Sequence, residues 1–388
     1  MEVIKYLNKK AVTLYCEGAL EALTSEFGIK VTHNEEYDLY ILNYSQIDSP
    51  KIHPIVTECR SLVVEFLQVG DLNIPEFSVV SRSFDRFLNL GENGNEDKID
   101  ITKMKAYEKL DGSLIGLFYY DGKWLYRTKS MIMPTEDMEI DAFGTKWKDK
   151  IEEALGSEYI EEIDIRMKNF FNNKTLILEF TSPYNRIVTQ YQDTSITLLA
   201  IRDNNTGEYI RNHLILDKTA TNCGWKIPNY FEFNSVDKCK EVVASLPDLQ
   251  EGFVLYDEFG VPKCKLKNSL YLAIHRLRGE CTPTPKRIMD LVFTNETDEY
   301  LTYFPEDKYL FEPYINAYED CYVNYCELEG ENRHIESQKD FTLVVKDTPV
   351  APLLFQKRQN KDLKFKQMFD KLNNNAKYKM VEKYLNEY

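Results

Sequence analysis

The sequence predicts an α+β protein in which antiparallel sheets with flanking helices are followed by an all-α C-terminal region. β-Branched and aromatic runs separated by glycine-containing turns fill the first two-thirds of the chain. Helical spacing with few strand signals replaces them after Thr284-Pro285. The 388 residues also exceed what one hydrophobic core ordinarily spans. We therefore expect two domains, 1–280 and 281–388.

The strands of the N-terminal region are expected from short apolar runs and the turns that join them. After Ser113 the residues alternate between apolar and polar, reverse at Asp121-Gly122 and return through Trp124 and Tyr126, which is a strong hairpin signal. Three further runs are typical of strands: TLILEF (175–180), SITLLAIRDNNTGEYI (195–210) and EGFVLYDEFGVPKCKLK (251–267). We expect the last two to fold back at their glycine-containing loops.

Helices are expected where apolar residues recur at helical spacing. In the N-terminal region these segments are 145–155 and 236–245, the second with Ser235 as a candidate cap. The C-terminal helices begin at TPKRIMDLVF, which has a threonine cap and a proline at the first helical position. Two later stretches, 315–329 and 359–388, extend the helical region.

The composition excludes several classes of protein. A formal net charge of −15 argues against nonspecific coating of nucleic acid but permits a local basic groove. Eight cysteines and five histidines lack the spacing of a zinc site, so we expect free thiols in a reducing compartment. No apolar run approaches the roughly 18–20 residues that span a bilayer, and the N-terminal stretch lacks the apolar core of a signal peptide. We therefore expect a cytoplasmic protein without a membrane partner.

The stretch AYEKLDGS places Lys109 directly before a turn and the first strand of the hairpin. A lysine amine is a nucleophile only when neutral, and holding it neutral near pH 7.4 costs about 4 kcal/mol against its reference pKa near 10.4. Nearby cations and a partly desolvated pocket lower such a pKa. A nucleophilic role for Lys109 therefore calls for other cations close to it, and the alternative is a solvated surface lysine.

The stretch KCKLK is a candidate source of those cations. Lys263, Lys265 and Lys267 alternate, so all three project from one face of a strand. One interpretation is a solvated edge strand, because lysine commonly protects sheet edges. The other is a phosphate clamp beside the nucleophilic lysine.

Charged residues also interrupt or adjoin apolar runs elsewhere in this region. Glu179 lies within LILEF, Arg60 begins the run RSLVVE, and Glu251 precedes the strand GFVLY. A buried carboxylate must be paired or hydrogen-bonded. For Glu179 a structural salt bridge is the alternative to a functional role.

In order along the chain, CRS, KLDGS, LEFTSPYNRIV, EGFVLY and KCKLK resemble the collinear motifs of covalent nucleotidyltransferases, which include DNA ligases, RNA ligases and mRNA capping enzymes. SRSFDRFLNLGE, EFTSPYNRIVTQYQ and RDNNTGEYI are more specific and resemble the bacteriophage T4-type RNA ligase 1 family of tRNA-repairing, ATP-dependent ligases. This resemblance covers roughly residues 35–275 well and the helical part weakly. It implies that 1–280 is the nucleotidyltransferase domain and that 281–388 selects the RNA substrate.

The resemblance implies that Lys109 attacks the α-phosphate of ATP, which releases pyrophosphate and leaves a lysyl-AMP. The adenylate then passes to the 5′-phosphate of one RNA end, and the 3′-hydroxyl of another end attacks to seal the strand. Lys265 and Lys267 match a pair that contacts the nucleotide phosphate, and we expect them to lower the pKa of Lys109. Arg60 and Glu179 match positions that hold the nucleoside, and Glu179 would also orient metal-bound water.

Further roles follow from the same resemblance. Glu251 matches an essential glutamate expected to steer hydrated Mg²⁺, or Mn²⁺, near the transferring phosphate. Arg86 stands where the family has a lysine against the triphosphate tail, and its planar fork would change that contact. Leu42 falls where a tyrosine lies near the nucleotide, so we expect a backbone contact at most.

Three more residues are candidates for metal or RNA contacts. Asp298 falls near a metal-linked aspartate of the helical domain, and the alternative is a solvated acid at a helix end. Lys129 and Tyr271 are candidates for contacting RNA, and the alternatives are a surface lysine and a core tyrosine.

The expected partner is RNA with 5′-phosphate and 3′-hydroxyl ends, such as a broken tRNA. We expect the protein to act as a monomer in the cytoplasm. If the source is a phage or another virus, this is the cytoplasm of the host cell. One alternative is a DNA ligase or capping enzyme, but these usually carry a C-terminal β-barrel where this chain is expected to be helical. The other is a noncatalytic protein that binds RNA ends. Loss of the motif lysine would indicate it, and Lys109 is present.

Overall fold

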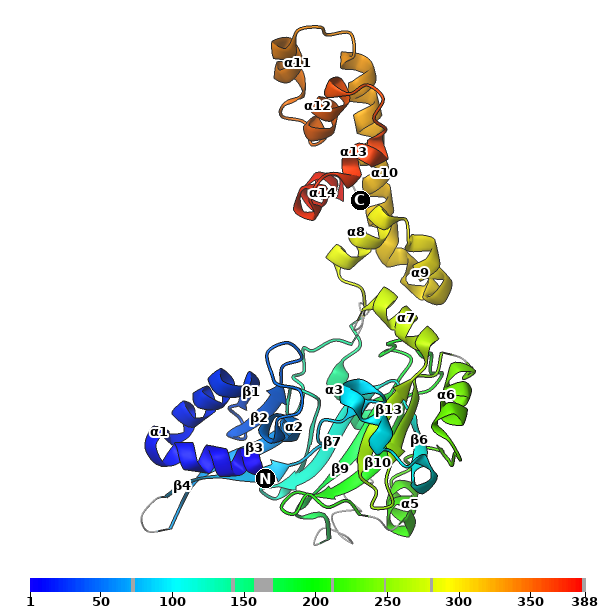
Figure 1. The fold of residues 1–388 in the computed structure, drawn as a ribbon. Helices are drawn as coiled ribbons and strands as arrows, with labels where there is room; N and C mark the ends of the chain where they lie inside the picture. The colour runs from blue at the N-terminus through cyan, green and yellow to red at the C-terminus, as the bar shows by residue number, and fades with distance from the viewer. Residues whose placement is uncertain are drawn as a thin grey trace. The chain divides into compact units, whose positions relative to one another are not determined.

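The computed structural model describes residues 1–70, 74–140, 144–156, 170–210, 213–247, 249–279 and 282–385. The chain divides into two compact units, Met1–His275 and Arg276–Tyr388, each treated separately below. The first combines sheets with helices, and the described part of the second contains helices without strands (Figure 1). This arrangement confirms the α+β class and the order of its parts. Within the described ranges, no helix combines the length and apolarity that crossing a membrane requires.

The first sheet is antiparallel and follows the chain order β1-β2-β3-β4. Helix α1 packs across it (Figure 1), with Val3, Leu7 and Leu23 in one apolar core with Leu42 and Leu62. The strand-dominated interpretation of this region did not include that long helix. The elements of this part are α1 (Glu2–Phe27), β1 (Ile29–Asn34), β2 (Leu39–Tyr44), α2 (Pro54–Glu58), β3 (Arg60–Val69) and β4 (Ile74–Ser81).

The second sheet has the antiparallel order β10-β9-β7-β8. Its hairpin turns at Asp121-Gly122, as predicted, and TLILEF forms a strand. The predicted reversal of the run 195–210 at its glycine-containing loop is confirmed, since Asp203 bonds to Glu208 and Ile210 bonds back to Ile201. The returning segment forms an isolated bridge from Tyr209 to Arg202 rather than a full strand. The elements are β7 (Ser113–Tyr120), β8 (Lys123–Arg127), α3 (Trp147–Leu155), β9 (Lys174–Thr181), β10 (Ser195–Asp203) and α5 (His213–Asn222).

The third sheet has the order β11-β6-β12-β13-β5, in which only β13 and β5 are parallel. The predicted hairpin of residues 251–267 is confirmed as β12 and β13. The cap of the neighbouring helix is confirmed too, since the Ser235 hydroxyl accepts from the Lys238 amide. The elements are β5 (Leu88–Asn89), the 3₁₀ turns η1 (Glu92–Gly94), η2 (Glu96–Lys98) and η3 (Ile101–Lys103), β6 (Lys105–Lys109), β11 (Tyr230–Phe231), α6 (Val236–Ala244), β12 (Gly252–Tyr256), β13 (Pro262–Lys267) and α7 (Ser269–Arg278).

The second and third sheets pack face to face, and strand β9 shows how this positions a charged side chain. Leu176 and Leu178 point to the apolar core that includes residues of α3 and α5. Ile177 points the other way, into a cluster with Val254 and Tyr256 of the third sheet. Side chains alternate along a strand, so Glu179 also faces the third sheet.

The second unit is built on one apolar core that α8, α10, α11, α12, α13 and α14 share. Its first helix is capped as predicted: the Thr284 hydroxyl accepts from the Arg287 amide at 3.3 Å, and Pro285 occupies the first turn. The elements are α8 (Pro285–Thr294), α9 (Thr297–Tyr303), η4 (Pro305–Asp307), α10 (Lys308–Asn332), α11 (Gln338–Val345), α12 (Ala351–Gln359), α13 (Phe365–Asp370) and α14 (Asn374–Val381).

Candidate active site

Three neighbouring strands bring Lys109, Glu251 and Lys267 together. Gly252, at the start of the central strand β12, pairs with Lys109 of β6 on one side and with Lys267 of β13 on the other. The preceding carboxylate of Glu251 therefore lies between the two lysines. Its Oε2 accepts from Lys109 Nζ at 2.6 Å, and its Oε1 accepts from Lys267 Nζ at 2.6 Å. Three separate motifs thus form one ion-paired cluster.

Two glycines are required by the close packing of these strands. Gly252 has φ +139°, and a Cβ there would lie 1.9 Å from the carbonyl oxygen of Leu266. A Cβ on Gly112 would lie 2.3 Å from the carbonyl oxygen of Phe180. Only glycine fits such positions. The glycines of KLDGS and EGFVLY therefore set how closely the lysines approach the carboxylates.

Glu179 lies in the same site but is not part of a salt bridge. It is buried, and its Oε1 accepts a hydrogen bond from the Gly112 amide at 3.1 Å. Among the residues that the structure describes, no cation lies within ion-pair distance of it, so the alternative of a structural salt bridge is wrong. Burial, opposed by Lys109 and reinforced by Glu251, raises the pKa of Glu179 to about 7. This carboxyl is therefore able to exchange a proton near neutral pH.

The expectation that Lys265 and Lys267 lower the pKa of Lys109 is wrong. Burial acts to lower this pKa, but the carboxylates of Glu251 and Glu179 outweigh it and raise the pKa of Lys109 above its ordinary value. Lys267 adds little opposing charge because it is paired with Glu251 itself. Before a nucleotide binds, Lys109 is thus held as an ammonium.

Beside this cluster lies a pocket of about 450 Å³ that Lys109, Glu179, Arg60 and Lys265 help to line. Arg60 and Lys265 both lie over the ring of Phe87, at 5.0 and 5.7 Å from its centroid. Lys265 forms no ion pair with any residue in the described ranges. Burial, and then the charges of Arg60, Lys267 and Lys109, lower the pKa of Lys265 to about 8. The pocket thus holds a poorly neutralised positive charge, as an anionic ligand requires.

Asp111, which sequence reasoning did not assign, organises the loop around the site. Its Oδ2 accepts from the amides of Val188 and Thr189, both at 2.8 Å, and its Oδ1 accepts from the Tyr271 hydroxyl at 2.6 Å. Its own amide donates to the Tyr191 hydroxyl at 3.0 Å. An aspartate before glycine is typical of a turn, which hides this role in the sequence. Two features of the sequence could have indicated this role. Asp111 lies within the lysine motif KLDGS, and three of its partners lie in the stretch VTQY of another motif.

The remaining candidates in this unit lie at different depths. Lys129 is exposed at the pocket rim, and its carbonyl oxygen accepts from Asn43 Nδ2 at 2.7 Å. Leu42 is fully buried in the N-terminal core, so its side chain does not reach the nucleotide pocket, whereas the adjacent Asn43 and Tyr44 line it. Arg86 places its guanidinium 4.2 Å from the centroid of the Tyr44 ring. Tyr271 is 2% exposed, so its hydroxyl faces Asp111 rather than solvent.

A family model described as RNA ligase, of the T4 RNA ligase 1 type, matches residues 58–271. This match spans more than half of the chain and every motif that meets at the pocket. The chain belongs to the T4 RNA ligase 1 family.

The names of two relatives include the words RNA ligase. A bifunctional polynucleotide kinase/RNA ligase of Autographa californica nuclear polyhedrosis virus is 32% identical over 386 residues, which are 95% of this chain and 52% of that protein. An RNA ligase of Rhodothermus phage RM378 is 26% identical over 74% of each chain. An archaeal ATP-dependent RNA ligase structure gives a TM-score of 0.45 at 15% identity, over 71% of this chain and 64% of that one. The chain thus spans about half the length of the viral relative.

Two cations, one in the lining of the pocket and one next to it, are available to an anionic ligand such as the polyphosphate of a nucleotide. Lys265 has no carboxylate partner among the described residues. Arg86 lies outside the lining, on the ring of Tyr44, and keeps a buried Nη1 atom without a hydrogen bond to any described residue. A buried donor of this kind needs an acceptor. Both carboxylate oxygens of Glu251 are paired with lysines, so its role toward a divalent metal stays a prediction. Asp298 lies in the first turn of α9, and the described residues contain no group of three or more ligating side chains there or elsewhere. Its metal role stays a prediction.

Nucleotide binding by this family member should weaken above about pH 8. Lys265 is charged below that pKa and neutral above it, and only the ammonium attracts phosphate, so the apparent Kd should rise by up to about tenfold per pH unit. The measurement is the Kd of ATP without divalent metal between about pH 7 and 9. Lys265→Arg keeps the charge throughout and should flatten the profile. An equally steep rise in that variant would contradict the assignment to Lys265.

Proposed function

We propose that this chain is an ATP-dependent RNA ligase that joins 5′-phosphate and 3′-hydroxyl ends through a lysyl-AMP and an RNA-adenylate. The observation that carries the proposal is that Lys109 and Lys265 line one pocket, while Glu251 joins Lys109 and Lys267 in an ion-paired cluster beside it, with these motifs in the order of the family. A nucleophile, a buried carboxylate and two phosphate-binding cations are the groups that nucleotidyl transfer needs.

In the proposed first step, the neutral amine of Lys109 attacks the α-phosphorus of ATP. The resting ammonium must first give up one proton to solvent, because an ammonium has no lone pair to donate, and its ion pair with Glu251 is then lost. A nitrogen–phosphorus bond forms, the bond from the α-phosphorus to pyrophosphate breaks, and the nitrogen gives up a second proton to solvent. Lys265 and Lys267 then stabilise the negative charge that builds up on the phosphates. Mg²⁺ or Mn²⁺, when bound, supplies further charge neutralisation, with Glu251 placed to hold its water shell.

In the following steps the RNA 5′-phosphate attacks the adenylate and releases Lys109, and the 3′-hydroxyl of the second end displaces AMP. A 5′-hydroxyl end cannot enter this sequence, so a polynucleotide kinase must supply its phosphate. The viral relative is named for both activities. Broken tRNA is the proposed substrate, and we propose that the protein acts as a monomer in the cytoplasm. Sedimentation velocity tests the monomer.

Two other functions use the same fold. A DNA ligase or capping enzyme would share the lysine chemistry, but the described residues after 282 form helices and no β-barrel. A noncatalytic RNA-end-binding protein would not need a lysine nucleophile paired with a buried carboxylate. Incubation with labelled ATP followed by a denaturing gel separates catalysis from binding, since only an enzyme keeps covalent AMP. Ligation rates on nicked tRNA anticodon loops, unstructured RNA and single-stranded DNA then identify the substrate.

A chain ending near Thr282 should still become adenylated, because the proposed chemistry lies wholly within the first unit. It should lose most of its preference for broken tRNA over a linear strand, since the second unit is proposed to select the substrate. Adenylation and the ratio of tRNA to linear ligation are measured on the soluble truncation. Lost adenylation in a well-folded truncation would instead place Asp298 and its domain in the active site.

A further inference from the structure

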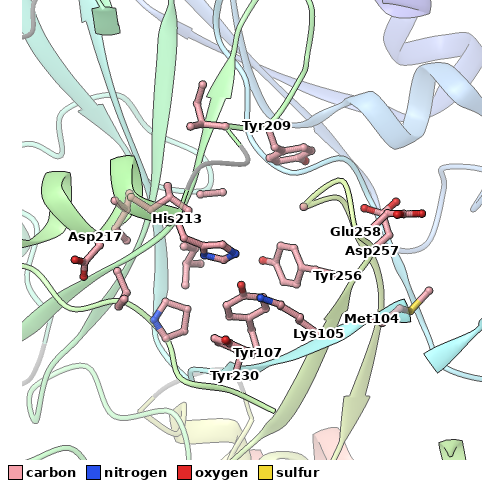
Figure 2. Close-up of a pocket in the computed structure, with 18 of the residues that line it drawn as sticks. Met104, Lys105, Tyr107, Tyr209, His213, Asp217, Tyr230, Tyr256, Asp257 and Glu258 are labelled. Atoms are coloured by element: carbon pink, nitrogen blue, oxygen red, sulfur yellow. The ribbon is translucent and has the colours of Figure 1, made fainter. Parts of the chain in front are cut away.

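A second pocket, of about 790 Å³, lies in the first unit and shares no lining residue with the candidate active site. It is formed by β6, β10, β11, helix α5 and the turn between β12 and β13 (Figure 2). Lys105, Tyr107 and Lys109 alternate along β6 and so share one face of that strand. The strand that carries the nucleophile therefore also contributes to the second pocket.

Aromatic side chains converge in this pocket. Figure 2 shows Tyr107, Tyr230 and Tyr256 grouped opposite His213. The Tyr107 ring lies 5.4 Å from that of Tyr230 and 5.0 Å from that of Tyr256, and the His213 and Tyr230 rings are within 25° of parallel at 6.4 Å. Such surfaces bind planar heteroaromatic groups, nucleobases above all, by stacking.

Lys105 supplies the pocket with a positive charge that no carboxylate neutralises. Its ammonium lies over the Tyr230 ring, 4.2 Å from the centroid, and it forms no ion pair or hydrogen bond with any residue in the described ranges. The neighbouring Lys103 differs, because it pairs with Asp100 at 3.1 Å. A phosphate is a stronger partner for an ammonium than an aromatic face is. An anionic group entering the pocket would therefore draw Lys105 away and free the ring for stacking.

Tyrosine hydroxyls add hydrogen-bonding capacity beside this charge. Tyr256 is 9% exposed, and Figure 2 shows its hydroxyl directed into the pocket toward His213. Neither this hydroxyl nor that of Tyr107 has a hydrogen-bond partner among the described residues. Hydroxyls that face a pocket without a protein partner are free to bond to a ligand, so the pocket offers donors for a ligand to use.

Carboxylates at the pocket limit the ligand's charge. Asp217, Glu232 and Glu258 line it, and none forms an ion pair with a residue in the described ranges. They are suited to accept hydrogen bonds from ribose hydroxyls or base amino groups. They would repel the successive phosphates of a polynucleotide. The lining therefore suits a ligand that carries one anionic group next to one aromatic group.

We propose that this pocket is a second nucleotide-binding site, for a mononucleotide whose base stacks on the tyrosines and whose phosphate binds Lys105. The inference does not depend on the ligase reaction, because it follows from the lining of a pocket outside the active site. Binding there and adenylation at Lys109 can therefore fail independently of each other.

The test is calorimetric titration of the full chain with AMP in the absence of divalent metal. A protein with Lys265→Ala, which weakens the active-site pocket, should still bind one AMP. Adding Lys105→Met or Tyr230→Leu to it should weaken that remaining binding by at least about tenfold. Tyr230 is 48% exposed, so its replacement leaves no core cavity. Lys103→Met, the paired lysine of the same pocket, is the matched control and should bind AMP as the parent does.

Further arms identify the ligand. Adenosine and orthophosphate should each bind the Lys265→Ala protein at least about tenfold more weakly than AMP, because each lacks one half of the contacts. Equal binding of orthophosphate would reduce the site to an anion site and overturn the proposal. If a short RNA oligomer displaced AMP and bound more tightly than AMP, the proposal that the site takes a single nucleotide would be overturned. Absence of AMP binding in the Lys265→Ala protein, with thermal melting unchanged from wild type, would overturn it altogether.

Discussion

Replacing Lys109 with alanine should abolish covalent attachment of AMP, because its amine is the proposed nucleophile, whereas Lys265 in the same pocket is proposed to bind phosphate. Lys109→Arg should fail equally, since arginine stays protonated and has no lone pair to donate. Arginine also keeps the positive charge beside Glu251, so it separates loss of the nucleophile from loss of the ion pair. The measurement is retention of label from ATP on a denaturing gel.

The prediction for Lys109→Ala holds only if the variant protein still folds. Truncation to alanine leaves the buried Glu251 with Lys267 as its cation partner, so the site keeps one of its two ion pairs and should still fold. Thermal melting close to that of wild type is the control. Covalent AMP on folded Lys109→Ala protein would remove Lys109 from the role of nucleophile.

Lys265→Ala and Lys267→Ala should each lower the rate of adenylation by more than about tenfold. Each removes a charge-assisted contact to phosphate worth on the order of 1.5–3 kcal/mol. Their routes differ, because Lys265 faces the pocket without a partner whereas Lys267 holds Glu251. Without Lys267, Glu251 would act on Lys109 alone and hold it more firmly as an ammonium. The pH at which adenylation begins should therefore move upward further in Lys267→Ala than in Lys265→Ala.

Lys263→Ala is the matched control for both substitutions. It lies on the same strand face, but its ammonium pairs with Asp257 at 2.9 Å, away from the pocket. Single-turnover adenylation across a pH series compares the three variants. The interpretation of this strand as a solvated edge is wrong, because β13 pairs with β12 on one side and β5 on the other. If Lys263→Ala were as damaging as the other two, the separate roles proposed for Lys265 and Lys267 would lose their support.

Local patterns in the sequence determined the strands, the helix caps and the motif residues. The hairpin at Asp121-Gly122 and the caps at Ser235 and Thr284 depend on neighbours within a few positions, so a single segment is enough to predict them. The lysines that alternate in KCKLK, such as Lys265, share a face for the same reason. The order of these motifs along the chain then indicated the family, and the family resemblance indicated their roles.

Only the tertiary structure decided how these groups act on one another. The pKa of Lys109 is raised rather than lowered because Glu251, far away in sequence, lies 2.6 Å from it across paired strands. Leu42 lies in the core because α1 covers its face of the sheet. Asp111 became the centre of a hydrogen-bond network only when residues near 188 and 271 reached it. Electrostatic and hydrogen-bond energies fall steeply with distance, and the distances between remote segments are fixed only by packing.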